Sequence, residues 1–427
     1  MPQNFAYLPR IVDGVLDQLL DGAPAIALRG ARGVGKTATA SRRAATTYNL
    51  DDEQTRAVVA ADPRRLLSGP KPILIDEWQL MPQSWDLVRR AVDRDRTAAQ
   101  FLLTGSASPT TPPAHSGAGR IVSVVMRPMA LAERGLTDPT VSLAELLTGR
   151  RGSIEGATHL SAEIYAHEIL ASGFPGLRGL PVPIVRAQLE SYIEHAIDRD
   201  FTDQGRPIRN RASLMRWLRA YSGAVSSTAS YEKIRDAASG GTSEKPAKTT
   251  VLNYIDVLES IWLIDPVPAW KPELNELRRL ALSPKHQLVD PALAARLRRV
   301  SVATLLDGQA PGALNQRYST LFGALFEAQV THDVRVYSQP ADASAFHFRD
   351  RDGGHEIDLI VEGPDQGVVA IETKLAATVN DGDVRHLVWL RDRIGDQLRD
   401  AVVVTTGREA YRRRDGVAVV PAALLGP

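Results

Sequence analysis

The chain contains no cysteine among its 427 residues. This absence excludes disulfide bonds and thiolate metal sites, and it fits a protein of the reducing cytoplasm. No apolar run reaches the length of a membrane span, and the amino terminus lacks the apolar core of a secretory signal. We therefore expect a cytoplasmic protein without a membrane partner.

A strong excess of either charge is also missing, since 51 basic residues face 50 acidic ones. A balanced total neither requires nor excludes a nucleic-acid partner, because a basic patch can form locally. At 427 residues the chain is too long for one ordinary hydrophobic core. We therefore expect three domains, over residues 1–150, 151–310 and 311–427.

The most specific motif is the segment GARGVGKT at residues 30–37. It fits the G-x-x-x-x-G-K-[ST] pattern, with an apolar strand at 25–28 before it and a helix-prone segment at 38–45 after it. These flanks disfavour a glycine-rich turn without a ligand. We predict that Lys36 contacts the β- and γ-phosphates and that the Thr37 hydroxyl ligates Mg²⁺. The residues predicted to surround the nucleotide are Gly30, Arg32, Gly33, Val34, Gly35, Lys36, Thr37 and Ala38.

A second apolar run, at residues 72–75, ends in two carboxylates, Asp76 and Glu77. Open α/β sheets bind ligands at the carboxyl ends of their strands, where these side chains would emerge. We predict that Asp76 holds the Mg²⁺ shell, directly or through water, and that Glu77 orients and polarises the attacking water.

A third strand, at residues 101–103, is followed by the hydroxyl residues Thr104 and Ser106. A parallel neighbouring strand would place them near the γ-phosphate as polar sensors of hydrolysis, and a turn cap is the alternative. Arg120 follows a loop rich in Pro, Ser, Thr and Gly over 106–119. It could reach a γ-phosphate in cis or in a neighbouring subunit of a homo-oligomer, or it could be an ordinary surface arginine.

Together these motifs resemble the prokaryotic AAA-type ATPases that carry an uncharacterised C-terminal domain. The resemblance rests on residues 32–37, 76–79, 103–106 and 119–120. Family members usually have an aliphatic residue where this chain has Trp78, a departure that touches no ligand. The resemblance implies ATP and Mg²⁺ as ligands, with the roles given above for Lys36, Thr37, Asp76 and Glu77. It does not settle Arg120, and it identifies no second sensor arginine.

Residues 151–310 predict a helical region. The segment 173–176 and the helix predicted at 187–203, with its Arg199-Asp200 pair, also resemble the family. Further on, helices at 231–238 and 248–261, a turn at 239–242 and a strand-like 262–264 follow the order of a winged helix. Its recognition helix would begin with the polar residues Lys245, Lys248, Thr249, Thr250 and Asn253. These suit contacts to DNA phosphates and grooves, while a winged helix that packs only against protein is the alternative.

Residues 311–427 predict a C-terminal α/β domain. A helix at 318–333 precedes three predicted strands, at 346–348, 356–361 and 369–374. A helix at 383–398 and strands at 401–407 and 416–420 complete the pattern.

Charged residues in this domain form a pattern of their own. Strand alternation puts Glu372 and Lys374 on one face, and a short hairpin brings Asp358 level with them. Two carboxylates that hold Mg²⁺, with a lysine that activates water or stabilises the pentavalent phosphate, are typical of a metal-dependent nuclease. This region resembles the restriction-endonuclease-like superfamily, whose pattern Asp358, Glu372 and Lys374 match. In that fold the preceding helix often adds a carboxylate, here Glu327. The alternatives are a solvated charged hairpin and a binding module without cleavage activity.

We interpret the chain as an α/β protein with a P-loop ATPase domain, a helical or winged-helix middle and a nuclease-like C-terminal domain. The predicted activity is Mg²⁺-dependent ATP hydrolysis that signals to the C-terminal domain, with DNA as a candidate target. One alternative is an ATP-gated, metal-dependent DNA nuclease. Another is a non-hydrolysing, ATP-bound regulator of a protein partner or of a toxin–antitoxin pair. The residues do not distinguish ATP from GTP.

Overall fold

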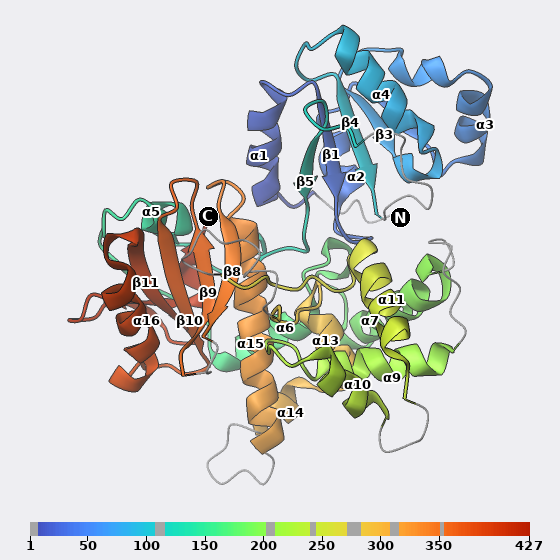
Figure 1. The fold of residues 1–427 in the computed structure, drawn as a ribbon. Helices are drawn as coiled ribbons and strands as arrows, with labels where there is room; N and C mark the ends of the chain where they lie inside the picture. Colours follow the sequence, from blue (N-terminus) through green and yellow to red (C-terminus); the bar gives the residue numbers. More distant parts are fainter. Residues whose placement is uncertain are drawn as a thin grey trace.

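The computed structural model describes residues 7–106, 116–201, 210–239, 245–270, 283–307, 316–350 and 354–427. An α/β lobe lies at the top of Figure 1, above a helical lobe and a lobe built on a second sheet. None of the helices in these ranges has the length and apolar character that a membrane crossing requires. The predictions that fall outside the described residues are the loop at 107–115, the turn at 240–242, the helix end at 202–203 and the Arg199-Asp200 side chains.

The upper lobe contains a five-stranded parallel sheet in the order β2-β3-β4-β1-β5. Its strands are β1 (Ala25–Arg29), β2 (Thr46–Asn49), β3 (Ile73–Asp76), β4 (Phe101–Gly105) and β5 (Val122–Val125). The sequences of β1, β3 and β4 are almost entirely apolar because these strands are covered on both faces. The order places β4 between β1 and β3, so the three predicted motifs share one edge of the sheet.

Short helices flank this sheet: α1 (Ile11–Leu20), α2 (Lys36–Ser41), α3 (Glu53–Ala61) and α4 (Gln83–Arg94). The helix expected at 38–45 ends at Ser41, because the chain turns into β2 soon afterwards. Asp52 caps α3 by accepting a hydrogen bond from Thr55 N at 2.8 Å, and Pro63 then begins a separate 3-10 helix.

The lower right of Figure 1 is helical. It contains α6 (Ala162–Ala171), α7 (Val182–His195), α9 (Arg211–Ser222), α10 (Tyr231–Ser239), α11 (Lys248–Ser260), α13 (Pro291–Leu297) and α14 (Val302–Asp307). The strand expected at 262–264 does not form, since Trp262 adopts a left-handed backbone with φ of 60° and Ile264 makes only an isolated bridge to Leu288. Without this strand the winged-helix fold is not confirmed, and it stays a prediction.

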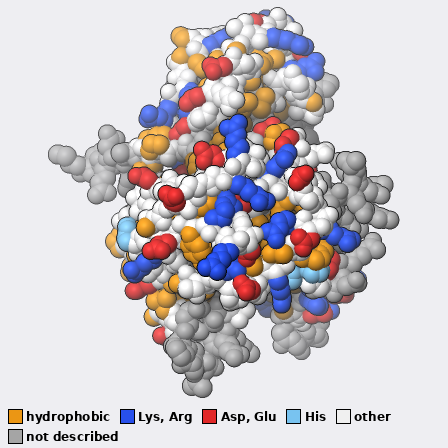
Figure 2. All heavy atoms as spheres, turned by 90° about the vertical axis from the view of Figure 1, so that its left-hand side faces the viewer, with side chains coloured by type: hydrophobic (Ala, Val, Ile, Leu, Met, Phe, Trp, Pro, Cys, Tyr) orange, Lys and Arg blue, Asp and Glu red, His pale blue; other side chains and the backbone are white. Residues whose placement is uncertain are grey.

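The third lobe is a seven-stranded sheet in the order β7-β12-β13-β11-β10-β9-β8. Its strands are β7 (Gly156–Ala157), β8 (Ser344–Arg349), β9 (Glu356–Glu362), β10 (Val368–Lys374), β11 (Leu398–Thr405), β12 (Glu409–Arg412) and β13 (Ala418–Pro421). Helix α15 (Gln316–Tyr337) packs on one face of this sheet and α16 (Asp381–Ile394) on the other. Figure 2 shows this lobe from outside, with Lys and Arg side chains interspersed among Asp and Glu side chains.

The segment between the first and second predicted domains belongs with the third lobe. Strand β6 (Val141–Ser142) pairs with β14 (Leu425–Gly426), and β7 pairs with β12. Helix α5 (Leu143–Leu147) packs between them against β11. The boundary expected at residue 150 therefore cuts through a segment that joins the C-terminal sheet.

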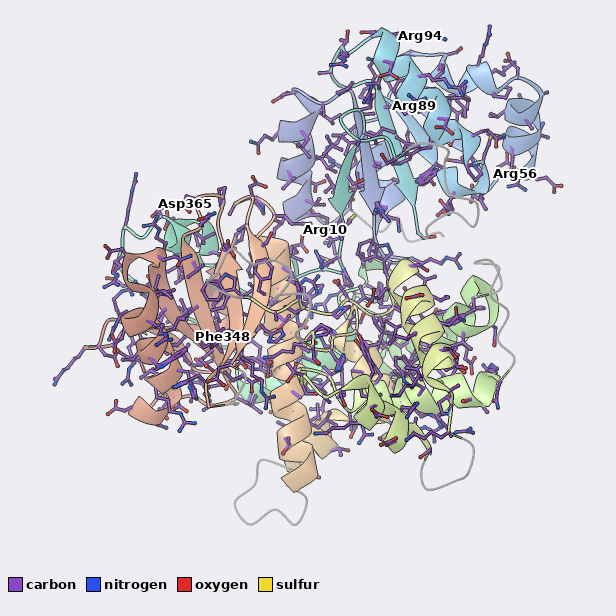
Figure 3. All side chains as sticks on the ribbon, viewed as in Figure 1. Arg10, Arg56, Arg89, Arg94, Phe348 and Asp365 are labelled. Carbon is purple, nitrogen blue, oxygen red and sulfur yellow. The ribbon has the colours of Figure 1, made fainter. Side chains whose placement is uncertain are left out.

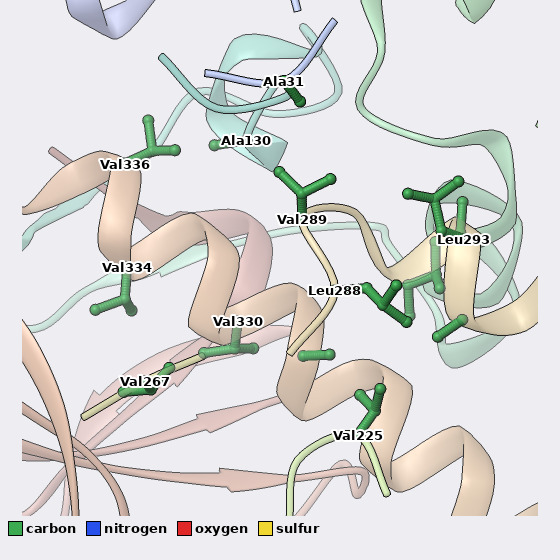
Figure 4. Packing of buried hydrophobic residues seen from close by; sticks show 14 of the residues in the cluster. Ala31, Ala130, Val225, Val267, Leu288, Val289, Leu293, Val330, Val334 and Val336 are labelled. Carbon is green, nitrogen blue, oxygen red and sulfur yellow. The ribbon is translucent and has the colours of Figure 1, made fainter. Parts of the chain in front are cut away.

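Helix α15 connects the lobes. It carries a buried apolar stripe, since Phe322, Leu325, Phe326 and Val330 are at most 1% exposed. Each such side chain stabilises the fold by roughly 1.5–3 kcal/mol. Figure 4 shows that the same core continues from Val330 and Val334 of the helix to Ala31 within the phosphate-binding motif.

Candidate functional site

The loop after β1 requires glycine at its strained positions. Gly30 and Gly35 have φ angles of 144° and 101°, values that L side chains rarely adopt. A Cβ at Gly30 would also lie 2.1 Å from the carbonyl oxygen of Met126, which follows β5. The loop conformation therefore depends on the glycines that the motif predicted.

Lys36 lies at the amino end of α2 and is only 5% exposed. Its Nζ donates hydrogen bonds to the carbonyl oxygens of Gly30 at 2.9 Å and Ala31 at 2.8 Å. Within the described part of the chain it forms no ion pair with a carboxylate. Burial lowers the pKa of Lys36 to about 8, against the weaker attraction of Glu77 and Asp76. The site thus holds a buried ammonium whose acceptors are uncharged.

Asp76, at the end of β3, connects the loop to the neighbouring strand. Thr37 Oγ1 donates to Asp76 Oδ1 and Oδ2 at 3.0 and 3.1 Å. Thr104, the register partner of Asp76 on β4, donates its hydroxyl to the same carboxylate. A hydroxyl and a carboxylate are suitable Mg²⁺ ligands, so Thr37 and Asp76 fit the predicted metal.

Glu77 has a left-handed backbone, with φ of 53° and ψ of 43°. Its carboxylate accepts hydrogen bonds from Gln79 Nε2 and, at 3.5 Å, from Ser106 Oγ. Such conformations are costly for a non-glycine residue and concentrate at functional sites. The structure therefore brings Lys36, Thr37, Asp76, Glu77, Thr104 and Ser106 to the same edge of the sheet.

Arg120 does not join this group. It precedes β5, whose first residue Val122 aligns with Ile26 at the start of β1. In a parallel sheet this is the edge opposite the phosphate-binding loop, and Arg120 Nε there donates to Asp93 Oδ1 at 2.8 Å. The prediction that Arg120 reaches the γ-phosphate in cis is therefore wrong, while a role in a neighbouring subunit remains a prediction.

Several residues that support the loop were not predicted. Arg10, 6% exposed, donates to the carbonyl oxygens of Val34 and Arg127, both at 2.8 Å, and to Glu133 Oε2 at 3.1 Å. Figure 3 labels Arg10 where the upper lobe meets the lower ones. Phe174 approaches Gly33, which gives the predicted segment 173–176 a place beside the loop. The sequence around Arg10 carries no motif that would have revealed these long-range contacts.

A second cluster of charged residues lies in the C-terminal lobe. The fully buried Lys285 donates from Nζ to Glu327 Oε1 at 2.7 Å, to Asp358 Oδ1 at 3.1 Å and to the Asp358 carbonyl oxygen at 3.3 Å. The expected hairpin holds Asp358 near β10, because Thr373 donates to Asp358 Oδ2 through N at 2.9 Å and through Oγ1 at 2.8 Å. Two of the carboxyl groups predicted to hold Mg²⁺, those of Glu327 and Asp358, thus contact an ammonium that the sequence did not indicate.

The protonation of this cluster follows from burial and from Lys285. Burial opposes the charge of Lys285, but Asp358 and Glu327 outweigh that effect and raise its pKa. Burial, reinforced by Asp358, raises the pKa of Glu327 to about 8 and that of Glu372 to about 10. Lys374, predicted to activate water, has its Nζ 3.7 Å from Asp383 Oδ1. Among the described residues no group of three or more His, Asp or Glu side chains is arranged to hold a metal ion.

Two of the predicted DNA-contacting residues form ion pairs within the protein. Lys245 pairs with Asp236, and Lys248 Nζ lies 3.6 Å from Glu232 Oε1, both acids on α10. These pairs reduce the positive charge that the start of α11 could offer to a phosphate backbone, and DNA contact remains a prediction.

Three parts of the chain match known protein families. Residues 22–134 match a family described as an AAA domain. Residues 162–304 and 322–425 match two families described only as domains of unknown function. The glycine loop and the parallel sheet are features of a P-loop nucleotide-binding fold, and the first match supports this fold for the upper lobe.

Similar whole proteins span nearly the full chain. Two uncharacterized proteins, from Mycobacterium bovis and Mycobacterium tuberculosis, are each 27% identical over 421 residues, or 95% of this chain and 82% of the relative. Among solved structures, the Walker-type ATPase of Pyrococcus abyssi is 16% identical, covers 67% of this chain and 94% of its own, and gives a TM-score of 0.39. The names of the mycobacterial relatives assign no activity.

Proposed function

We propose that the upper lobe binds ATP with Mg²⁺ and hydrolyses it, and that α15 passes the nucleotide state to the lower lobes. The observation that carries this proposal is Lys36, a buried ammonium that donates to two carbonyl oxygens and forms no ion pair with a carboxylate of the described residues. Because burial of a charge without a counter-charge is unfavourable, this position favours an anionic ligand.

The site residues have separate tasks in the proposed reaction. Lys36 exchanges its carbonyl acceptors for phosphate oxygens, and the loop amides contact the same phosphates. Thr37 and Asp76 would hold Mg²⁺, which when bound neutralises phosphate charge. Glu77 orients a water molecule and accepts its proton. The water oxygen bonds to the γ-phosphorus as the bond to the bridging oxygen breaks, and ADP leaves with that electron pair.

The connection to the lower lobes runs through residues 125–134, which follow β5. Leu131 N donates to Asp333 Oδ1 and Ala132 N to the Tyr337 hydroxyl, each at 3.1 Å. Gln339, just beyond α15, donates to the Val125 carbonyl oxygen at 2.5 Å. These contacts attach the carboxyl end of α15 to the strand beside β1.

A partly buried ion-pair network strengthens the same junction. Arg127 and Arg335 each donate to a different carboxylate oxygen of Asp265 at 2.8 Å. Arg10 donates to Arg127 and to Val34, so it joins this network to the phosphate-binding loop. A rearrangement of the loop on nucleotide binding would therefore reach α15 through direct contacts.

Phosphate release by the purified full-length chain tests the proposal, with ATP and GTP compared and with DNA present or absent. We expect Lys36→Ala to lower turnover by about 100-fold or more, as for loss of a charge-stabilising donor. The exposed Lys233→Ala on α10 is the matched control and should behave as wild type. If wild type releases phosphate no faster than Lys36→Ala in every condition, the ATPase proposal is wrong.

The same assay separates hydrolysis from binding alone. A non-hydrolysing regulator, whether it acts on a protein partner or within a toxin–antitoxin pair, would bind ATP tightly and be unaffected by Glu77→Gln. Lys285 argues against the nuclease alternative, because its ammonium contacts Glu327 and Asp358, two of the predicted metal ligands.

A further inference from the structure

Lys285 is held in place by both its backbone and its side chain. Its N and O exchange hydrogen bonds with Val267, each at 2.9 Å, in an isolated antiparallel bridge. From there the side chain enters the C-terminal lobe, with none of its surface exposed. It meets Glu327 from α15 and Asp358 from β9, so three separate segments converge on one ammonium.

The ammonium has a full set of acceptors. A lysine head group carries three N–H donors, and Lys285 directs hydrogen bonds to three oxygen atoms of Glu327 and Asp358. Carboxylate and carbonyl oxygens are also the ligands that a hard divalent cation prefers. The lysine therefore uses the oxygen atoms that a metal ion would require.

One oxygen beside this cluster has no partner. Glu372 is 6% exposed, and its Oε1 is buried without a hydrogen bond to any described residue. Lys374 does not supply that bond, since its ammonium lies beside Asp383. The Lys285 ammonium does not supply that bond either, so Glu372 lies beside the acceptor set of Lys285 and not within it.

We propose that Lys285 is the resident cation of the C-terminal lobe, in the place that a divalent metal would take between Glu327 and Asp358. Wild-type protein then holds no metal at this cluster and does not cleave phosphodiesters there by metal catalysis. Removal of the ammonium leaves two carboxyl groups and the Asp358 carbonyl oxygen facing one point, so it opens a position for a divalent cation. This inference concerns the lower lobe and does not depend on ATP hydrolysis above.

Manganese binding to the nucleotide-free full chain tests the proposal, with free Mn²⁺ followed by electron paramagnetic resonance. We expect Lys285→Met to bind one further Mn²⁺ per chain, at least tenfold more tightly than wild type at that cluster. Adding Asp358→Asn to the same variant should abolish the gain. Lys374→Met is the matched control, because it removes a neighbouring lysine that does not contact these carboxylates, and it should create no site.

Two results would overturn the proposal. One is a folded Lys285→Met protein, judged by circular dichroism, that binds no more Mn²⁺ than wild type. The other needs no Lys285 variant to fold: wild type that binds one Mn²⁺ per chain without nucleotide, or cleaves DNA with Mn²⁺, and loses that property in Asp358→Asn. Loss of ATP turnover in any variant would bear on the upper lobe alone.

Discussion

Two buried lysines, Lys36 and Lys285, have opposite surroundings. Lys36 donates to two backbone carbonyls, and burial lowers its pKa to about 8. Lys285 is buried still more completely, yet carboxylates raise its pKa. Burial alone therefore does not define a functional lysine. The charge of the hydrogen-bond acceptors distinguishes the two lysines. Lys36, whose acceptors are neutral, is suited to bind an anionic ligand, whereas the charge of Lys285 is already compensated by carboxylates.

Because their surroundings differ in charge, the two lysines should contribute differently to the free energy of unfolding. A buried ammonium without a counter-charge is unfavourable for folding, and such strain is tolerated where function requires it. A buried ion pair contributes little net stability, but removal of one partner leaves the other charge uncompensated. Substitution of the two lysines by methionine should therefore have contrasting effects.

The largest expected effect is on the free energy of unfolding of Lys285→Met. We expect a loss of about 3–5 kcal/mol, because Asp358 and Glu327 lose their shared cation. Lys36→Met should leave the free energy of unfolding unchanged or slightly higher, since it removes an uncompensated charge. Urea unfolding of both variants at one pH makes the measurement. Equal destabilisation by the two substitutions would contradict the proposed difference between the Lys36 and Lys285 sites.

Glu77→Gln tests the role of Glu77 as the proton acceptor in the upper site. The amide retains the shape of the side chain but cannot accept the proton of the attacking water. We expect turnover to fall by about 10²–10⁴-fold while ATP affinity stays near that of wild type. Binding measured with a fluorescent ATP analogue and phosphate release provide the two readouts. A parallel loss of affinity would mean that Glu77 shapes the pocket rather than assists hydrolysis.

Asp333 lies on α15, between the two lysine sites. We expect it to make the free energy of unfolding depend on pH. It is fully buried, and burial raises its pKa to about 7. Its stabilising contribution is therefore complete below its unfolded-state pKa near 4 and is lost as the pH rises through 7. Asp333→Asn should flatten the fall in unfolding free energy between pH 5 and 8, by up to about 1.4 kcal/mol per unit of pKa shift.

Asp265 is the control for this measurement. Burial alone would raise its pKa, but Arg127 and Arg335 lower it to about 2. Its contribution is present above the unfolded-state pKa and is lost only as the pH falls towards 2. Asp265→Asn should therefore leave the slope between pH 5 and 8 unchanged. Curves for wild type and Asp333→Asn that run parallel would contradict the assignment of Asp333.

The smallest effect is expected for Arg120→Ala. Its ion pair with Asp93 is partly exposed and screened by water, so its loss should change the free energy of unfolding little. Because Arg120 lies at the far edge of the sheet, turnover should be unchanged. A fall of about 10³-fold or more that depends on protein concentration would instead reveal an arginine acting across a subunit interface.

Local patterns in the sequence predicted most of the upper site. Asp76 and Thr104 end neighbouring apolar strands, and parallel pairing brings such ends together without further information. The hairpin that places Asp358 beside β10 is likewise a short-range feature. Arg120 is a different case, since a strand parallel to β1 begins at the opposite edge, and its position could have been inferred from that direction.

The remaining features depend on contacts between distant segments. Lys285 reaches Glu327 and Asp358 from a stretch with no apolar periodicity and only an isolated bridge. Strands β6 and β7 have two residues each, too few for a recognisable alternation, so their pairing with the C-terminal lobe was not predicted. Such contacts are fixed by the assembled core and leave no local pattern.

Calorimetric titration with ATP and Mg²⁺ tests the central claim most directly, on wild type, Lys36→Met and the control Lys374→Met. We expect one ATP per chain for wild type and for Lys374→Met. For Lys36→Met we expect an affinity about 100-fold lower, within the range for hydrogen bonds to charged groups. Wild-type affinity in Lys36→Met would show that this buried ammonium does not bind a phosphate and would contradict the proposed ATP site.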